Sequence, residues 1–455
     1  SSTMRLIAYM KPYAHWVIFA LLLVLGLTTF DLYRPMLVGD AIDTFGANGD
    51  YDVIIATAIK YAVVLALSFA FNIAQTWILQ KTGQNIILQI RKDLYRHIQS
   101  LGSRYFDITP VGKLVTRVTN DVEALNEMYS GILVQLFRNI VKIVGLAGVM
   151  LVLDVRLAAI SFVLMPLVIG LTVLCQKIAR NIYRLYRTRL TDINTFLSEH
   201  LSGMKIIQIF GRQERKFEEF HDKNTKLYKA FYREMLMYAV FRPLIYILSI
   251  LSLMIVLWFG SRNVFDEIIS VGTLYIFSNY IRSFFDPIQE LAEQFSTLQS
   301  SIASAEKIFT VMDEDEFIPE VENPKQPDKI TGKIEFDHVW FAYDGENYVL
   351  KDVSFVINPG EKVAFVGATG AGKSSILNLI GRYYDIQKGH IYIDGIDIRQ
   401  LSKKQLRSAI GQMQQDVFIF EGDVAYNIRL NDDDITDAQV KAAAEYVNAS
   451  HFIEK

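Results

Sequence analysis

Gly367-Ala-Thr-Gly-Ala-Gly372-Lys373-Ser374-Ser375 fits the phosphate-loop pattern G-x-x-x-x-G-K-[ST] at every fixed position. An apolar run at 363–366, typical of a strand, precedes it. In such a loop, successive backbone N–H groups form an anion-binding nest, and the helix that follows adds its positive dipole end. We therefore predict a nucleotide phosphate site formed by Gly367, Thr369, Gly370, Ala371, Gly372, Lys373, Ser374 and Ser375.

Two side chains of the loop have specific chemical roles. Lys373 can reach the outer phosphates of a nucleotide, and the Ser374 hydroxyl can hold Mg²⁺. We expect ATP and Mg²⁺ as cofactors, with Lys373 as a catalytic residue and Ser374 as a metal ligand. The loop alone leaves the class of protein open, because kinases, GTPases and many ATPases share it.

The composition indicates a chain that is partly membrane protein and partly soluble protein. Hydrophobic residues make up 51% of the 455 residues and charged residues 21%. This length suits two domains better than one core. The net charge of −3 and the lack of a basic block argue against a nucleic-acid partner. Cys175 is the single cysteine, so no internal disulfide can form, and the histidines lack the spacing of transition-metal ligands.

Six apolar stretches precede the phosphate loop, and each approaches the roughly 20 residues that a membrane-crossing helix needs. They lie near 15–38, 53–80, 132–153, 157–175, 241–261 and 268–290. The alternatives are buried helices of a soluble protein and, for the first stretch, a cleaved signal peptide. Because several stretches are apolar all round, we interpret them as membrane spans. Met4–Tyr13 could lie on the inner membrane surface as an amphipathic helix.

The charges of the connecting segments predict the orientation. The loop Gly39–Asp52 has no Lys or Arg, whereas 81–131 carries seven and 176–238 carries thirteen. Positive charge stays on the cytoplasmic side. We therefore expect a multi-pass protein of the cell membrane whose N-terminus, long connections and nucleotide-binding domain are cytoplasmic. Each long connection could form two helices of about 25 residues, a stalk about 37 Å long at 1.5 Å per residue.

The pattern changes after the membrane part. Asp313–Glu316 and the prolines that follow predict a solvated linker at 313–332, between a transmembrane domain at 1–312 and the N-terminal part of a nucleotide-binding domain at 333–455. In this last domain, alternation predicts strands at 334–341, 353–357, 362–366 and 390–394, and helices at 374–383, 402–408 and 437–448. The predicted fold is an all-α six-helix transmembrane domain with long cytoplasmic helical stalks, followed by an α/β P-loop domain.

The surroundings of the loop narrow the class. Phe341-Ala-Tyr343, then Val349-Leu350, Ser354-Phe355 and Gly360-Glu361, followed by the phosphate loop, resemble the ATP-binding cassette (ABC) family. The resemblance implies that the Tyr343 ring stacks on adenine. Packing of this strand aromatic in the core is the alternative.

A second stretch, Ile410-Gly-Gln-Met-Gln-Gln415-Asp-Val-Phe-Ile-Phe420, resembles the glutamine loop of the same family. The resemblance implies that Gln415 contacts Mg²⁺ and the attacking water, as a catalytic residue and metal ligand. Gln412 and Gln414 are its rivals for this assignment.

The membrane part resembles the exporters of the family. Pro35-x-x-x-Gly39-x-x-Ile42-Asp43 is similar to the outer end of their first span, Phe106–Asp121 to the first coupling element, and Leu197–Phe210 to the second. Helix surface with caps and ion pairs is the alternative for the two coupling stretches. The resemblance covers essentially the whole chain. It is closest to half-size bacterial exporters of the multidrug or lipid type.

One departure is severe. The family has a signature loop of the type L-S-G-G-Q, a catalytic Glu after a strand-ending Asp, and a switch His, and none of these follows the phosphate loop. The resemblance thus implies a nucleotide-binding domain truncated at its C-terminal side. We expect the natural chain to continue beyond Lys455.

The resulting hypothesis is ATP-driven export of a lipophilic or amphipathic substrate, such as a drug, lipid or peptide. The chain would be an ATP hydrolase coupled to transport and one half of a homo- or heterodimer, surrounded by membrane lipid. The alternative is an ATP-binding regulatory half whose site hydrolyses poorly. An importer is disfavoured, and a gated channel stays open.

Charges and aromatics inside the spans suggest a pathway. Arg138 and Lys142 lie one turn apart, and each costs about 2.5–3.5 kcal/mol in lipid at mid-depth. They should face the bundle interior or snorkel inward. Arg282 and Asp286 are four residues apart and could pair. Tyr275, Phe277, Tyr280, Phe284 and Phe285 could line an aromatic cavity or simply pack between helices.

Overall fold

The protein is described by a computed structural model covering residues 2–49, 51–163, 165–413, 417–430, 432 and 434–454. The side chains of Asn48 and Arg242 are not described. The chain forms two compact units, one of residues 1–101 and 105–316 and one of residues 102–104 and 317–455.

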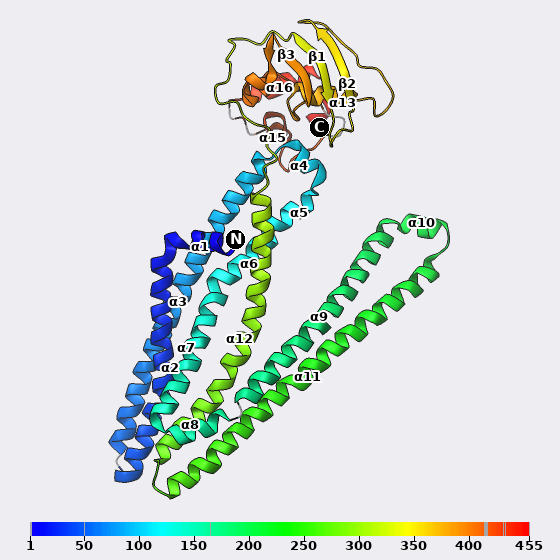
Figure 1. Cartoon of the computed structure of the whole chain (residues 1–455). Coiled ribbons are helices and arrows are strands. Elements are labelled where there is room, and N and C mark those ends of the chain that lie inside the picture. The colour runs from blue at the N-terminus through cyan, green and yellow to red at the C-terminus, as the bar shows by residue number, and fades with distance from the viewer. Residues whose placement is uncertain are drawn as a thin grey trace. The chain divides into compact units, whose positions relative to one another are not determined.

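The first unit is helical (Figure 1). Its helices are α1 (Ser2–Met10), α2 (Ala14–Asn48), α3 (Tyr51–Ser100), α4 (Ser103–Ile108), α5 (Val111–Thr116), α6 (Val122–Glu127), α7 (Leu133–Leu153), α8 (Val155–Phe162), α9 (Met165–Ser202), α10 (Met204–Ile209), α11 (Gln213–Phe265) and α12 (Val271–Met312). A 3₁₀ turn, Lys11–Tyr13, joins α1 to α2. The π-helical turns Arg117–Asp121 and Met128–Ile132 continue α5 into α6 and α7.

Among the described residues, five helical stretches are long and apolar enough to cross a membrane. They are Ser2–Ala47, Tyr51–Ser100, Val111–Leu153, Val155–Ser202 and Gln213–Phe265. Five of the six predicted spans lie in these stretches. The sixth, 268–290, lies in α12, which includes Arg282 and Asp286 and is outside this group.

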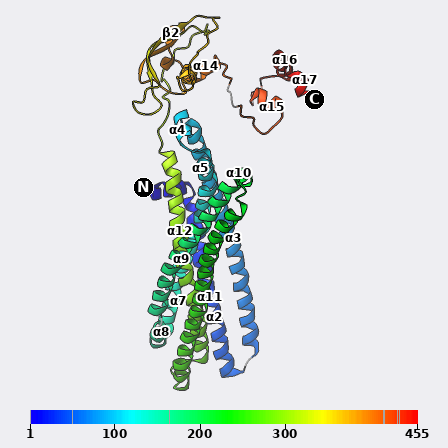
Figure 2. The ribbon, with the colours of Figure 1, turned by 90° about the vertical axis from the view of Figure 1, so that its right-hand side faces the viewer.

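Two helical pairs differ in how they are packed. Figure 2 shows α2 beside α3, and both also contact other helices of the unit. The pair α9 and α11, connected by α10, forms a hairpin whose α10 end diverges from α7 and α12 in Figure 1. Many large apolar side chains on this hairpin are exposed, including Phe217, Tyr228 and Phe231.

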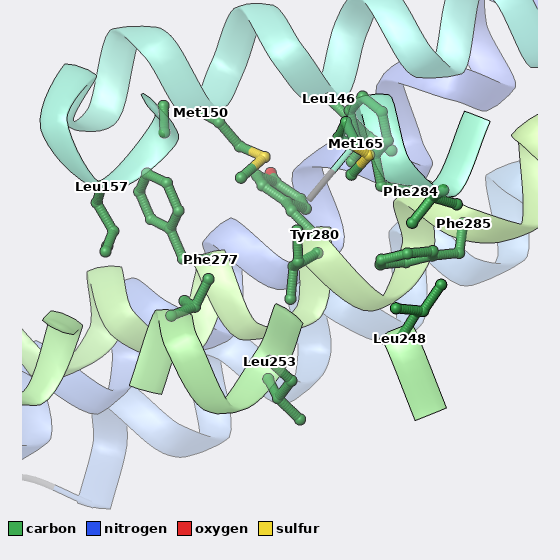
Figure 3. Packing of buried hydrophobic residues seen from close by; sticks show 14 of the residues in the cluster. Leu146, Met150, Leu157, Met165, Leu248, Leu253, Phe277, Tyr280, Phe284 and Phe285 are labelled. Atoms are coloured by element: carbon green, nitrogen blue, oxygen red, sulfur yellow. The ribbon is translucent and has the colours of Figure 1, made fainter. Parts of the chain in front are cut away.

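The main core of this unit lies where α7, α8, α9, α11 and α12 meet. Figure 3 shows Phe277 and Tyr280 of α12 directed at Met150 and neighbouring apolar side chains. Phe277 is 0% exposed, and Phe284 and Phe285 are buried in the same cluster. The rings of Phe277, Phe284 and Phe285 therefore pack between helices, the alternative that the sequence left open, whereas Tyr275 and Tyr280 also line a cavity of about 280 Å³.

The C-terminal part of α2 and the N-terminal end of α12 are in close backbone contact. A Cβ on Gly272 would lie 2.1 Å from the carbonyl oxygen of Gly39. Asp43 Oδ1 accepts a hydrogen bond from the Gly272 N–H at 2.7 Å. This N–H belongs to the first turn of α12, which has no acceptor within its own helix. We call this contact of Gly39, Asp43 and Gly272 the α2–α12 clamp.

The second unit contains one antiparallel sheet and short helices. The strands β1 (Ile334–Phe341), β2 (Leu350–Ile357), β3 (Lys388–Ile393) and β4 (Ile396–Asp397) have the order β2-β1-β3-β4. The helices are α13 (Lys373–Ile380), α14 (Lys403–Ser408), α15 (Val424–Arg429), α16 (Asp437–Tyr446) and α17 (Ser450–Ile453). A 3₁₀ turn spans Ile398–Gln400. The predicted strands at 334–341, 353–357 and 390–394 and the three predicted helices occur here with shifted ends.

The prediction of a strand at 362–366 is wrong. The structure assigns no strand there, and the Val366 side chain is 94% exposed. Its apolar composition suits a strand with neighbours on both sides, but a strand forms only where adjacent strands supply hydrogen-bond partners. The four strands of the described part pair with one another instead.

The segment after α12 is attached to the second unit by specific hydrogen bonds. Arg382 Nη2 donates to the Pro319 carbonyl at 3.1 Å. Lys403 Nζ donates to the Ile318 carbonyl at 2.8 Å and pairs with Glu320 at 3.2 Å. The proline-rich segment is thus held against α14 at 318–320, although its composition alone suggested a solvated linker.

Candidate functional site

The phosphate loop has a backbone that only glycine adopts easily. Gly370 and Gly372 both have φ of +86°, in the left-handed region. A Cβ on Gly372 would also lie 2.7 Å from Leu350 Cδ2. Gly372 immediately precedes α13, so the loop enters the helix at its N-terminal N–H groups. This local geometry positions donors and the helix dipole for an anion.

Lys373 is held over its own loop. Its Nζ donates hydrogen bonds to the carbonyl oxygens of Gly367 and Ala368, both at 2.8 Å. The ammonium therefore lies beside the backbone that would surround a phosphate. The Ser374 side chain belongs to an exposed residue, so its hydroxyl is accessible to a metal ion. These residues fit a nucleoside triphosphate with its cation, since the backbone N–H donors and the Lys373 ammonium lie on the same turn.

Tyr343 is connected to the loop by Ser375. Its hydroxyl and the Ser375 Oγ are 2.9 Å apart and share a hydrogen bond. The Tyr343 ring also makes edge-to-face contacts with Phe341 and Tyr384, with centroids 4.7 and 5.1 Å apart. The ring thus packs against the core of this unit, as the alternative expects, while its hydroxyl lies beside the phosphate loop; stacking on adenine stays a prediction. Gln415, the second predicted catalytic residue, lies outside the described residues.

A charged corner stabilises the sheet in this unit. Arg399 Nη2 and Asp397 Oδ2 form an ion pair at 2.6 Å, and Asp397 Oδ1 accepts from the Arg399 N–H at 2.8 Å. Burial opposes ionisation of this carboxyl, but hydrogen bonds from Arg399 and His390 outweigh it and lower the pKa of Asp397 to about 2. The carboxylate therefore stays ionised at neutral pH and fixes the turn that follows β4.

The membrane unit brings four charged side chains together. Arg138 Nη2 of α7 lies 3.4 Å from Asp31 Oδ2 of α2, and Asp31 also accepts from Arg34 one turn along the same helix. Arg138 thus faces the bundle rather than lipid. Lys142 lies one turn from Arg138 and lines a cavity of about 280 Å³ together with Asp31 and Arg34. Asp31 and Arg34, an i,i+3 pair in an apolar helix, were missed, although such a pair signals a buried contact.

The pair predicted within α12 is not formed. Arg282 and Asp286 are both exposed and make no ion pair with any residue that the structure describes. Nearby, Glu290 instead accepts a hydrogen bond from Asn139 of α7 at 2.9 Å. The four-residue spacing allowed a pair, but each side chain points away from the packed face of α12.

Two comparisons with known proteins bear on this arrangement. The family models "ABC transporter transmembrane region" and "ABC transporter" match residues 17–288 and 350–455. A Streptococcus pneumoniae protein named as an ABC transporter ATP-binding protein, exp8, is 36% identical over 99% of this chain and 77% of its own length.

The chain belongs to the ABC transporter family. A Bacillus subtilis protein named as a multidrug resistance ABC transporter ATP-binding/permease protein, YheH, is 34% identical over 87% of this chain and 59% of its own length. A Mycobacterium bovis protein named as a fatty acid ABC transporter ATP-binding/permease protein is 34% identical over 86% of this chain and 62% of its own length. This ABC transporter chain is therefore a multi-pass membrane protein with an ATP-binding domain, and an ATPase coupled to transport.

The first predicted coupling stretch of this ABC transporter chain is tied to α12. Asp121 forms an ion pair with Arg117 one turn before it and accepts a hydrogen bond from Ser304 of α12 at 3.0 Å. Asp121 is buried, so this contact is shielded from water. The end of this stretch is therefore joined to α12, and a coupling role for it stays a prediction. In the second stretch, Ile206, Ile209 and Phe210 at α10 are exposed.

Proposed function

We propose that this protein exports a lipophilic or amphipathic compound across the cell membrane, as one half of a dimeric ABC exporter driven by ATP. The observation that carries the proposal is the phosphate loop of one unit, built around Gly372 and Lys373, in the same chain as a bundle of membrane-spanning helices. The names of the relatives, which refer to multidrug resistance and to fatty acid, support export of lipophilic compounds in general.

The proposed roles of the site residues follow the chemistry of the loop. The backbone from Gly367 to Ser375 would hold the phosphates, with Lys373 at the outer ones. Ser374 and Gln415 would hold Mg²⁺, which neutralises phosphate charge when bound. Tyr343 would contact the adenine, and its hydrogen bond to Ser375 fixes the ring beside the loop.

The proposed membrane arrangement has six spans, with α12 as the sixth. The basic segments 81–131 and 176–238 would then lie in the cytoplasm as stalks, together with the N-terminus and the ATP-binding domain. The domain division at 1–312, 313–332 and 333–455 belongs to the same proposal. A second half-transporter, identical or not, would complete the assembly. The exposed apolar side chains of the α9–α11 hairpin offer it a surface.

The experiment replaces Lys373 by Ala in every copy of the complete protein. ATP hydrolysis, and ATP-dependent uptake of a lipophilic fluorescent dye into inside-out vesicles, should fall by roughly 10²-fold or more, because a charge aimed at the transferred phosphate is lost. Lys351→Ala is the matched control, since Lys351 is an exposed lysine of β2. Undiminished hydrolysis and uptake by Lys373→Ala would contradict the proposal.

The alternative is a regulatory half that binds ATP and hydrolyses it poorly. It predicts that the protein purified without a different subunit retains ATP binding but has no ATPase activity that depends on Lys373. Measuring both in the same preparation separates the two candidates.

A further inference from the structure

The charged group inside the membrane unit has an excess of positive charge. Among the residues that the structure describes, Asp31 is the one carboxylate that pairs there, and it is shared by Arg34 and Arg138. Lys142, on the same helix as Arg138, forms no ion pair or hydrogen bond with any residue that the structure describes. Glu290 of α12 accepts a hydrogen bond from the neutral amide of Asn139 and forms no ion pair with Lys142. Of the three cations, Lys142 is therefore the one without an ion pair among the described residues.

Unused hydrogen-bond donors accompany this excess. The Nε of Arg34 is buried and has no partner among the described residues. The Lys142 ammonium has three donors, and the cavity of about 280 Å³ that it lines is also lined by Tyr61, Asn279 and Ser283. The buried Nε of Arg34 lacks the partner that buried donors normally have, and Lys142 is half-buried with its charge at the cavity, so the cavity is suited to a ligand that brings anionic oxygens.

An apolar groove adjoins this cavity. It has a volume of about 480 Å³ and runs between α2 and α3, lined by residues such as Ile42, Phe45, Ile54 and Ala58. Val38 and Tyr61 line both the groove and the charged cavity. A cationic compartment and an apolar compartment therefore share a boundary, with volumes suited to the two ends of one amphipathic molecule.

We propose that these two compartments bind an anionic amphiphile, with its carboxylate or phosphate at Lys142 and Arg34 and its hydrocarbon chain in the groove of α2 and α3. The inference rests on the proposed export function and narrows its substrate to one charge class. Lipophilic cations are repelled here, because the local cations outnumber the paired carboxylate. The hydroxyl and ester oxygens of neutral lipids can accept hydrogen bonds from Lys142, but they leave its positive charge without a counter-charge and are weaker acceptors than anionic oxygens.

Binding to the complete protein in nanodiscs of neutral lipid, without ATP, tests this site directly. The probes are oleate, lysophosphatidate, oleyl alcohol and dodecylammonium, with acetate and inorganic phosphate as anions that lack a chain. Oleate, lysophosphatidate or both should bind at least about tenfold more tightly than the neutral, cationic and chainless probes, since a hydrogen bond to a charged group contributes more than a neutral one. The tighter of the two anions identifies the headgroup.

Two variants locate the binding. Lys142→Met keeps the length of the side chain and should weaken binding of the anionic amphiphile about tenfold or more, whereas Lys142→Arg should restore it. Lys177→Met, an exposed lysine of α9, is the control and should bind as the unchanged protein does. Ala58→Phe fills part of the groove and should weaken binding of oleate more than that of octanoate.

Equal binding of oleate and oleyl alcohol, or unchanged binding by Lys142→Met, would overturn the site. If acetate or inorganic phosphate binds as tightly as the anionic amphiphiles, the claim that the ligand needs a hydrocarbon chain is wrong. These outcomes are independent of the export proposal, because Lys373→Ala should keep the binding and lose ATP-driven uptake. If Lys373→Ala loses uptake but the unchanged protein shows no preference for anionic probes, the export proposal is retained and only the inference of an anionic-amphiphile site is rejected.

Discussion

The α2–α12 clamp and the α9–α11 hairpin show two opposite ways of arranging membrane helices. At the clamp, Gly39 and Gly272 bring two backbones into contact, and the Asp43 carboxylate bonds across the gap. On the hairpin, Gly170 has open space around it, and Phe217 and Tyr228 are exposed. The first pair is built to move as one body, whereas the second has packing surface to offer a partner.

The largest expected effect is at the glycine of the clamp. Gly272→Ala places a methyl group 2.1 Å from the Gly39 carbonyl oxygen and close to the Asp43 carboxylate, so the helices must separate. Overpacking of this kind costs typically about 1–3 kcal/mol or more. We expect a clear fall in the midpoint of thermal unfolding in detergent. An unchanged midpoint would show that the clamp is not a close contact.

The matched glycine on the hairpin should behave in the opposite way. Gly170→Ala lies within α9, where nothing approaches the new Cβ within 4 Å. Replacing a glycine inside a helix stabilises by about 0.5–1 kcal/mol. The same thermal measurement should therefore show an equal or higher midpoint. If the unfolding midpoint of Gly170→Ala fell as far as that of Gly272→Ala, the proposed difference in packing between the two regions would be wrong.

An intermediate effect is expected at Asp43. Asp43→Ala removes the acceptor of the Gly272 N–H, and loss of a hydrogen bond to a charged group costs about 1.5–3 kcal/mol. The midpoint should fall less than for Gly272→Ala, because no atoms clash. Asp40→Ala, an exposed carboxylate one turn away on α2, is the control. Equal falls for both variants would point to the charge of this segment rather than to the bond.

The smallest effect belongs to an ion pair of the hairpin. Lys226 Nζ lies 2.6 Å from Asp222 Oδ2, with both side chains more than half exposed. Surface pairs contribute little because water and salt screen them. Lys226→Met should leave the midpoint unchanged within error. A measurable fall would indicate that this part of the hairpin is packed against another surface in the preparation.

The sequence predicted features that depend on local pattern. The glycine-rich turn, the helix after it and the apolar helices occur as predicted because spacing and composition are sufficient for them, and phosphate binding by the turn stays a prediction. Tyr343 was named from its place in a motif and its contact with adenine stays a prediction; its hydrogen bond to Ser375 depends on how two segments 32 residues apart meet. The family assignment came from motifs and is confirmed by the matching family models.

The errors arose where neighbours decide the outcome. The run at 362–366 has the composition of a strand, yet a strand needs partners that sequence cannot count. For Phe277 and Phe284 the sequence left a cavity and helix packing open, because rings that suit a binding site suit a core equally well, and the structure shows packing. Asp31 and Arg34 were overlooked because their meaning appears only when Arg138, more than 100 residues later, is placed beside them.

A ligand that binds Lys373 must compete with the hydrogen bonds that this side chain already makes to its own loop. Two backbone carbonyls already accept hydrogen bonds from this ammonium, at 2.8 Å each. A ligand that binds Lys373 therefore gains only the difference in hydrogen-bond free energy between its own oxygens and these two carbonyl oxygens. Ionised phosphate oxygens are stronger acceptors for an ammonium than neutral carbonyl oxygens, whereas the oxygens of uncharged solutes are not. If the loop binds a nucleotide as proposed, Lys373 would exchange these two carbonyls for phosphate oxygens and would keep them when only uncharged solutes are present.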